Sequence, residues 1–316
     1  MPVPEQVLAL VRTQVAQQVP PGIMALADAA RERHGASVRA VLLYGSSMRT
    51  GNVHDGLADL YLLVDDYRSA FNRLSLAFLN WLLPPNVFYL EVPFEGHVLR
   101  AKYAVLRLSD FARGTEKWFH SYLWGRFCQK SVLVYARDEF SAGQVHEALA
   151  SAVMTFATRT LPRMDSAFTA RDLWAKGLSL SYRAELRTEQ ADGAARLFDA
   201  DVEYYQALTT AALTAFPFIV RGQADIRRHR YQAEIPSQIR RLNGMAWRAR
   251  IVQGKILSVL RLLKGLLTFK GGVDYILWKI ERHSGVRIEV GPGLRQLPPL
   301  AVLVIFWRLY RRNAFR

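Results

Sequence analysis

Cysteine is almost absent from the sequence: Cys128 is the only one among 316 residues. A single thiol excludes an internal disulfide framework and any zinc site built on cysteines, and it suits a reducing compartment. Histidine does not take over this role, because none of the seven histidines forms a pair at metal-ligand spacing. Zinc chemistry based on cysteine or histidine is therefore not expected.

Long apolar runs are also missing. No stretch reaches the ~20 apolar residues that a membrane-spanning helix needs, and the nearest approach, residues 297–307, is interrupted by Pro298-Pro299. The N-terminus lacks a basic start and a long apolar core, and Glu5 argues against a transit peptide. We expect a cytoplasmic protein without a signal peptide.

Acidic residues are scarce in the last third of the chain. Residues 1–220 hold 22 Lys and Arg against 22 Asp and Glu, whereas residues 221–316 hold 20 against 5. The whole net charge of +15 therefore comes from the C-terminal region. A neutral body with a basic end indicates a surface that meets something anionic, either nucleic acid or acidic lipid, or else a solvated helical face.

The apolar pattern predicts an α+β fold. Strands are expected at 38–44, 58–64, 87–92, 98–106 and 132–135, and helices at 5–33, 67–83 and 108–127. After residue 140 helical patterns dominate, at 145–161, 170–188 and 194–215. The predicted domains are a mixed sheet with flanking helices over 1–140, a helical domain over 141–220 and a basic amphipathic region over 221–316.

A Gly-Ser corner joins the first two expected strands. Tyr44-Gly45-Ser46-Ser47 ends the first strand, and Asp59 opens the second after a spacer. Glycine lets a phosphate approach the backbone, the serines offer hydroxyl and N–H groups, and a carboxylate on the next strand can hold Mg²⁺. This order is typical of nucleotidyltransferases. The alternative is a plain turn with Asp59 as a strand-end cap.

The second acid of the usual nucleotidyltransferase pattern is missing, because Tyr61 stands where it is expected. Asp65 and Asp66 lie about 20 Å further along an extended strand, too far for a simple replacement. Glu91 on the next expected strand is the candidate for a further metal ligand.

Several motifs together resemble the mitochondrial-type phosphatidate cytidylyltransferases, the CDP-diacylglycerol synthases built on a nucleotidyltransferase fold. "YGSSMRTG…ADLYLLVDD" resembles the family's Tyr-Gly-Ser-Gly followed by one Asp and Val-Asp-Asp, so Tyr61 matches the family. Lys102-Tyr103-Ala104-Val105, "WFHSYLWGRFCQK" at 118–130 and "LSYRAELR" at 180–187 follow in the family's order. Ser47, Ser131 and Ala184-Glu185 depart from its pattern, which indicates a divergent member that we expect to be bacterial.

The resemblance implies roles for individual residues. Asp59 would bind Mg²⁺, and Lys102, Arg126 and Lys130 would neutralise the charge of triphosphate or phosphatidate. The residues expected to bind the nucleotide or close the site are Tyr44, Gly45, Ser46, Ser47, Lys130, Ser181, Tyr182, Glu185 and Arg187. From the residues alone, Arg126 and Lys130 could equally lie in the last turn of a helix, where cations interact favourably with the helix dipole. Tyr182 could equally be a core residue.

The basic end combines apolar and cationic side chains. "KILSVLRLLKGLLTFK" at 255–270 places apolar residues at helical spacing between Lys and Arg, and residues 297–316 add an apolar, aromatic and basic segment. This pattern is typical of helices that lie on an anionic membrane surface, so residues 251–316 are expected to contact the membrane. Nucleic-acid binding and packing on the helical domain are the alternatives.

Taken together, the sequence predicts an Mg²⁺-dependent CTP:phosphatidate cytidylyltransferase that makes CDP-diacylglycerol and pyrophosphate at the membrane surface. One alternative is a nucleotidyltransferase with another acceptor, such as RNA, a small molecule or a protein. The other is a degenerate nucleotidyltransferase that serves as a lipid- or nucleic-acid-binding module.

Overall fold

The computed structural model describes residues 2–45, 57–185, 192–212, 215–216, 219–222 and 230–268. The chain folds into two compact units, each built from two segments. Met1–Gln18 and Arg107–Val259 form what we call the helical unit, and Val19–Leu106 and Leu260–Arg316 form the sheet unit. These units are not cut at residues 140 and 220, and the domain boundaries expected there remain a prediction.

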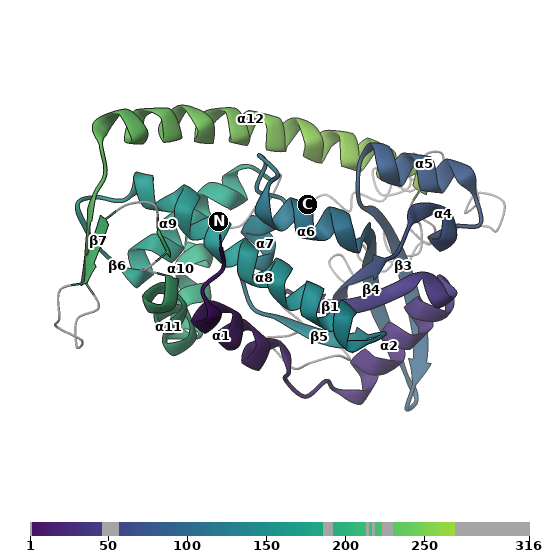
Figure 1. Cartoon of the computed structure of the whole chain (residues 1–316). Helices are drawn as coiled ribbons and strands as arrows, with labels where there is room; N and C mark the ends of the chain where they lie inside the picture. Colours follow the sequence, from purple (N-terminus) through teal and green to yellow (C-terminus); the bar gives the residue numbers. More distant parts are fainter. Residues whose placement is uncertain are drawn as a thin grey trace, which may run out of the picture. The chain divides into compact units, whose positions relative to one another are not determined.

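The sheet unit contains a four-strand arrangement in the order β3-β4-β2-β1 (Figure 1). Its strands are β1 (Val38–Tyr44), β2 (Ala58–Val64), β3 (Asn86–Phe94) and β4 (His97–Arg107). β1 runs antiparallel to β2, and β3 runs antiparallel to β4. The helices are α2 (Pro21–Glu32), α4 (Tyr67–Ala70) and α5 (Leu74–Leu82), and the short 3-10 turn η1 (Gly35–Ser37) lies between α2 and β1.

Alternation along these strands gives the sheet two different faces. Val41, Leu43, Leu60 and Leu62 are fully or almost fully buried, and α2 packs against β2 and β3. At one edge of this core the rings of His34, Phe71, Phe88 and Tyr103 meet, with centroids 5.3–6.0 Å apart. The other face carries Tyr44, Asp59, Tyr61, Lys102 and Glu91.

The helical unit is organised around α8 (Glu139–Thr160), which packs against α1 (Glu5–Val15), α6 (Leu108–Glu116), α7 (Trp124–Phe127) and α9 (Ala170–Arg183). Phe156 and Trp174 stack at its centre, with ring centroids 4.7 Å apart. The remaining elements are β5 (Ser131–Ala136), η2 (Leu161–Arg163), α10 (Asp192–Asp199), α11 (Val202–Ala212), and a small sheet in the order β6-β8-β7 formed by Ala167–Thr169, Arg230–Glu234 and Ile219–Gly222.

The long helix α12 (Ser237–Thr268) begins in the helical unit, and its residues from Leu260 belong to the sheet unit. In the helical unit, Arg250 fixes it to the chain before α7. The Arg250 Nε donates to the carbonyl of Phe119 at 2.6 Å, and its guanidinium lies 4.6 Å from the Phe119 ring and 4.5 Å from the Trp247 ring. Burial lowers the pKa of Arg250 to about 10, which leaves it charged at neutral pH.

The α+β prediction is confirmed, and so is the existence of all five strands, whereas several predicted helices were too long. Pro20-Pro21 separates α1 from α2, so residues 5–33 are not one helix. Residues 108–127 form α6 and α7 with a turn between them, residues 67–83 form α4 and α5, and residues 194–215 split at residue 200. In the part of the chain that is described, no helix is both long and apolar enough to cross a membrane.

Candidate functional site

Gly45 and Asp59 lie side by side at one end of the β1–β2 pair. The antiparallel register places Tyr44 opposite Asp59, so Gly45 follows directly at the end of β1. Gly45 has φ +94°, and a Cβ built on it would lie 3.3 Å from Asp59 Oδ2. That conformation and that proximity both favour glycine. Of the predicted Gly-Ser corner, the structure places Gly45 beside Asp59, whereas Ser46 and Ser47 lie outside the described residues.

Lys102 completes this arrangement from β4, the other neighbour of β2. Its Nζ lies 3.0 Å from Asp59 Oδ1, and the Asp59 side chain is 22% exposed. One carboxylate oxygen therefore faces a cation, and the other faces the space that a side chain at position 45 would enter. We call Gly45, Asp59 and Lys102 the aspartate–lysine cluster.

Tyr61 has a structural role at the position where a second acid was expected. Its side chain is buried, and its ring meets that of Tyr44 edge-on with centroids 5.6 Å apart. A carboxylate there would replace a buried aromatic contact with a desolvated charge. The substitution is therefore compatible with a folded site that uses one aspartate on β2.

Glu91 is engaged elsewhere on the same face. Its Oε1 accepts a hydrogen bond from the Tyr89 hydroxyl at 2.7 Å and pairs with Arg100 Nε at 3.0 Å. β3, which carries Glu91, is separated from β2 by β4. The structure thus does not bring Glu91 to Asp59 as a ligand pair. Among the described residues, no group of three or more His, Cys, Asp and Glu side chains could hold a metal ion.

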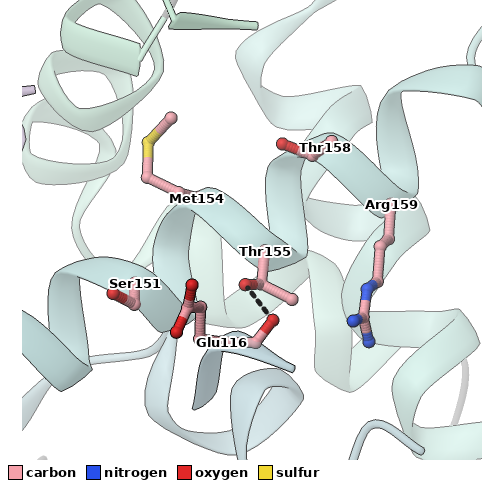
Figure 2. Close-up of a pocket in the computed structure, with 6 residues that line it drawn as sticks. All are labelled: Glu116, Ser151, Met154, Thr155, Thr158 and Arg159. Carbon is pink, nitrogen blue, oxygen red and sulfur yellow. Dashed lines mark hydrogen bonds between the residues drawn. The ribbon is translucent and has the colours of Figure 1, made fainter. Parts of the chain in front are cut away.

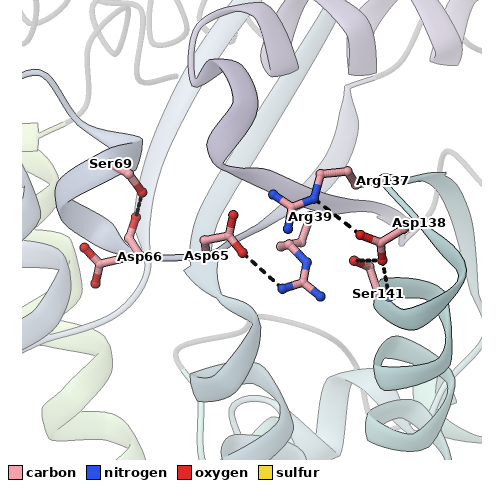
Figure 3. Close-up of polar contacts among 7 residues, drawn as sticks. All are labelled: Arg39, Asp65, Asp66, Ser69, Arg137, Asp138 and Ser141. Atoms are coloured by element: carbon pink, nitrogen blue, oxygen red, sulfur yellow. Dashed lines mark hydrogen bonds and ion pairs between the residues drawn. The ribbon is translucent and has the colours of Figure 1, made fainter.

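Asp65 and Asp66 at the far end of β2 have other functions. Asp65 Oδ1 pairs with Arg39 Nη1 at 3.0 Å (Figure 3), and Asp66 Oδ2 accepts the backbone N–H of Arg68 at the start of α4. In the helical unit, Asp138 caps α8 in the same way by accepting the Ser141 N–H at 2.6 Å. Both acids at the end of β2 therefore serve local structure.

A second set of predicted residues gathers in the helical unit. Arg126 Nη2 pairs with Glu185 Oε2 at 2.8 Å, and the two side chains are only 8% and 13% exposed. The Arg126 guanidinium also lies 4.3 Å from the centre of the Tyr122 ring. The structure therefore joins α7 to the end of α9 through two residues predicted from separate motifs.

Lys130 lies near this pair in sequence and contacts residues that the sequence did not single out. Its ammonium pairs with Asp201 and lies 5.0 Å from the centre of the Tyr204 ring. Burial lowers the pKa of Lys130. Neither Asp201 nor Tyr204 stands in a recognisable motif, so only the fold reveals them.

Ser181 and Tyr182 differ in character although they are adjacent. The Ser181 hydroxyl donates to the Gly177 carbonyl at 2.9 Å, and a Cβ on Gly125 would lie 2.8 Å from Ser181 Oγ. Ser181 therefore packs α9 against α7. Tyr182 donates instead to Gln129 Oε1 at 3.3 Å. Arg187 lies outside the described residues.

A pocket of about 180 Å³ opens in the helical unit between the end of α6 and α8 (Figure 2). Thr155 Oγ1 donates there to the Glu116 carbonyl at 3.3 Å, and Arg159 Nη1 donates to the Trp118 carbonyl at 2.6 Å. None of the predicted site residues lines this pocket. It is lined by Glu116, Ser151, Met154, Thr155, Thr158 and Arg159.

A protein-family model described as mitochondrial phosphatidate cytidylyltransferase matches residues 69–236, which is just over half of the chain. The chain belongs to this family. The match covers Lys102, Arg126, Lys130 and the 180–187 motif of this phosphatidate cytidylyltransferase family member, and it begins after Gly45 and Asp59. The ion pair between Asp59 and Lys102 connects those two residues to the matched region.

The other comparisons add little. No curated protein matches the sequence significantly. A crystal structure of a nucleotidyltransferase-like protein from Exiguobacterium sibiricum 255-15 shares 10% identity, with a TM-score of 0.24 over 78% of this chain and 80% of that chain. A likeness of this size carries no argument about the present phosphatidate cytidylyltransferase family member.

Proposed function

We propose that this family member is a CTP:phosphatidate cytidylyltransferase that serves phospholipid synthesis. A phosphate oxygen of phosphatidate attacks the α-phosphorus of CTP, the bond from that phosphorus to the bridging oxygen breaks, and pyrophosphate leaves. The product is CDP-diacylglycerol. The lipid phosphate is already anionic at neutral pH, so no strong general base is required, and transfer depends on positioning and charge neutralisation.

The aspartate–lysine cluster is the observation that carries the proposal. Gly45 leaves open the approach to Asp59 Oδ2, and the Lys102 ammonium lies 3.0 Å from Oδ1. A lysine on a flexible stem supplies a point charge to a triphosphate, and a backbone without a Cβ allows phosphate oxygens to come close. We assign these two functions to Lys102 and Gly45, with Tyr44 fixing the end of β1 through its contact with Tyr61.

Asp59 fits the role of magnesium ligand. Its Oδ2 faces the gap that a side chain at position 45 would fill, and Mg²⁺ is commonly held by one or two carboxylates together with substrate phosphates. When bound, Mg²⁺ would supply neutralisation of the triphosphate charge. Asp59 is the residue of this chain that we expect to hold it, and Glu91, committed to Arg100 and Tyr89, is the weaker candidate.

In the helical unit, Arg126 and Lys130 are held by carboxylates, Glu185 and Asp201. We propose that these pairs keep the two cations in fixed positions for contact with an anionic group. A planar guanidinium that is oriented by a carboxylate and a ring loses less conformational freedom when it binds phosphate. Tyr182, through Gln129, contributes to the same segment.

The membrane part of the proposal is supported by α12. Between residues 251 and 268 this helix exposes Val252, Ile256, Val259, Leu260, Leu262 and Leu263 and contains no Asp or Glu. Each Lys or Arg near an anionic leaflet contributes about 1 kcal/mol of binding free energy. We therefore propose that residues 251–316 bind peripherally to the inner face of the cell membrane.

The decisive experiment is transfer of label from CTP to phosphatidate presented in mixed micelles, with ATP and GTP as competing donors and RNA as a competing acceptor. We expect radiolabelled CDP-diacylglycerol and one pyrophosphate per turnover. Label transferred to RNA but not to phosphatidate would replace this proposal by a different acceptor. No transfer from any donor, with retained lipid or RNA binding, would instead identify a degenerate nucleotidyltransferase.

A further inference from the structure

Helix α5 exposes a stripe of large apolar side chains. Leu74, Phe78, Trp81 and Leu82 are 75%, 56%, 60% and 61% exposed, and their i, i+4, i+7, i+8 spacing puts them on one stripe of the helix. In a helix that only packs on its own domain, this stripe would face the core. We call these four residues the α5 patch.

The buried residues of α5 are Ala77 and Asn80, and the hydrogen bonds of Asn80 fix the orientation of the helix. Asn80 is fully buried, its Nδ2 donates to the Val105 carbonyl at 3.0 Å, and its Oδ1 accepts the backbone N–H of Asn86. Asn86 Nδ2 in turn donates to the Leu76 carbonyl at 2.9 Å. Rotating the α5 patch inward would bury apolar groups at the expense of these satisfied hydrogen bonds.

The end of α12 is held against the chain that follows α5. Lys264 Nζ donates to the carbonyls of Leu83 and Pro85, the latter at 2.7 Å, and Arg261 Nε donates to the Pro84 carbonyl at 3.0 Å. Figure 1 shows this end of α12 beside α5. The exposed side chains of this part of α12 are again apolar, namely Leu260, Leu262 and Leu263.

Between Asp66 and Glu91, the chain that carries the α5 patch has positive charges only. Residues 67–90 contain Arg68 and Arg73 and no acid, and residues 260–268 contain Arg261 and Lys264 and no acid. Burial and the neighbouring Arg261 charge lower the pKa of Lys264 to about 7, so the three arginines supply most of the positive charge at neutral pH. A second copy of the chain docking on this surface would bring these cations together, which disfavours self-association. An anionic lipid surface complements both the apolar stripe and the cations.

We infer that the α5 patch inserts into the interfacial region of an anionic lipid bilayer and forms a membrane contact of the sheet unit in addition to residues 251–316. A helix of nine residues is too short to cross a bilayer but can lie in its interface. Tryptophan is enriched at membrane–water interfaces, and tryptophan, phenylalanine and leucine are typical of the apolar face of helices that lie in the interface. The inference extends the proposed function, whose substrate is a lipid, but lipid binding can be measured without turnover.

Vesicle sedimentation with the full chain tests the inference. Phe78→Ser combined with Trp81→Ser removes two exposed rings, and Phe140→Ser, at a 70% exposed phenylalanine on α8, is the control. With vesicles of phosphatidylcholine and phosphatidylglycerol, we expect the double variant to lose about 100-fold in partition coefficient, roughly tenfold for each ring. The control should bind like the unmodified protein, and vesicles of phosphatidylcholine alone should bind more weakly in every case.

A second measurement locates the contact directly. Trp81→Phe keeps the apolar surface and removes one of the seven tryptophans. Lipids brominated on the acyl chain should quench tryptophan fluorescence less in this variant than in the unmodified protein, while vesicle binding stays the same. Equal quenching in both proteins would overturn the inference, because Trp81 would then lie outside the bilayer.

Two other results would also overturn it. One is unchanged binding of the Phe78→Ser, Trp81→Ser variant to anionic vesicles. The other is a dimer of the unmodified protein, measured by sedimentation equilibrium, that the double variant fails to form. Absence of cytidylyl transfer together with Trp81-dependent vesicle binding would refute the proposed function and leave this inference standing, so the two failures are distinguishable.

Discussion

A Cβ on Gly45 would lie 3.3 Å from Asp59 Oδ2, and the φ angle of Gly45 is +94°. Two independent constraints, backbone conformation and space in front of a carboxylate, thus act on the same position. They can be separated experimentally because other glycines of the sheet unit share only one of them.

Gly45→Ala is expected to reduce kcat/KM for cytidylyl transfer on the order of 100-fold, because the methyl group displaces the carboxylate or the approaching phosphate. The stability loss should be only about 1–2 kcal/mol, from the left-handed backbone. Gly96→Ala is the matched control: its φ is +77°, and a Cβ there would meet nothing within 4 Å. If both variants lost equal activity, steric access to Asp59 would not be the reason.

Asp59→Asn and Glu91→Gln should differ sharply. The Asp59 variant is expected to lose on the order of 1,000-fold in kcat and to need more Mg²⁺, because a neutral amide is a poor magnesium ligand. Glu91→Gln should stay within about threefold of the unmodified protein, since its partners are Arg100 and Tyr89. Magnesium titrations of turnover provide the measurement, and a raised magnesium requirement in the Glu91 variant would restore Glu91 as a ligand.

Arg126→Met should destabilise the protein by about 3–5 kcal/mol, because it leaves the half-buried Glu185 carboxylate without its cation. Arg126→Met combined with Glu185→Leu should recover most of this loss, since both charges are then removed. Urea denaturation of the single and double variants measures the effect. If Arg126 also contacts substrate, the double variant remains inactive although it is stable; recovered activity would show that the pair is purely structural.

His34 gives the sheet unit a pH-dependent stability. Burial lowers the pKa of His34, with a smaller opposing effect from its 2.7 Å hydrogen bond to the Ala70 carbonyl. Below the unfolded-state pKa of about 6.5, the unfolded chain binds a proton that the folded state accepts only at lower pH. The free energy of unfolding should therefore fall as the pH drops below about 6.5.

His34→Gln keeps a donor for the Ala70 carbonyl and cannot titrate in this range. Urea denaturation between about pH 5.5 and 7.5 should show a smaller decrease towards acid for this variant than for the unmodified protein. Parallel pH profiles would mean that another group, such as His146, whose pKa burial also lowers, accounts for the acid sensitivity.

The parts of the fold that the sequence predicts well are those with strong apolar patterns. The strands at 38–44 and 58–64 have the bounds expected from their apolar runs. The prediction of a single helix at 108–127 was wrong. The spacing of its aromatic residues is typical of a helix, but the chain turns after Glu116. There, the Trp118 carbonyl accepts hydrogen bonds from Trp124 Nε1 and Arg159 Nη1. Arg159 lies on α8, 41 residues after Trp118 in the sequence.

The site was predictable to a similar extent. Gly45 and Asp59 meet because two consecutive strands pair antiparallel, which a short connection favours. The partner of Lys102 could not be foreseen, because β4, and not β3, is the neighbour of β2. The same strand order explains why Glu91 does not lie next to Asp59. Its strand, β3, follows β2 in sequence but is separated from β2 in space by β4. The partners Asp201 and Tyr204 depend on tertiary packing alone.

The register of β1 and β2 has a consequence for tracing relatives of this protein. Tyr44 faces Asp59 through the hydrogen-bond ladder of the sheet, so the pairing, and not the number of residues between the strands, brings glycine and carboxylate together. Insertions or deletions in that connection leave this juxtaposition intact. Profile searches that demand a fixed interval between the two motifs will therefore discard genuine homologues, whereas alignments anchored on strand pairing will retain them.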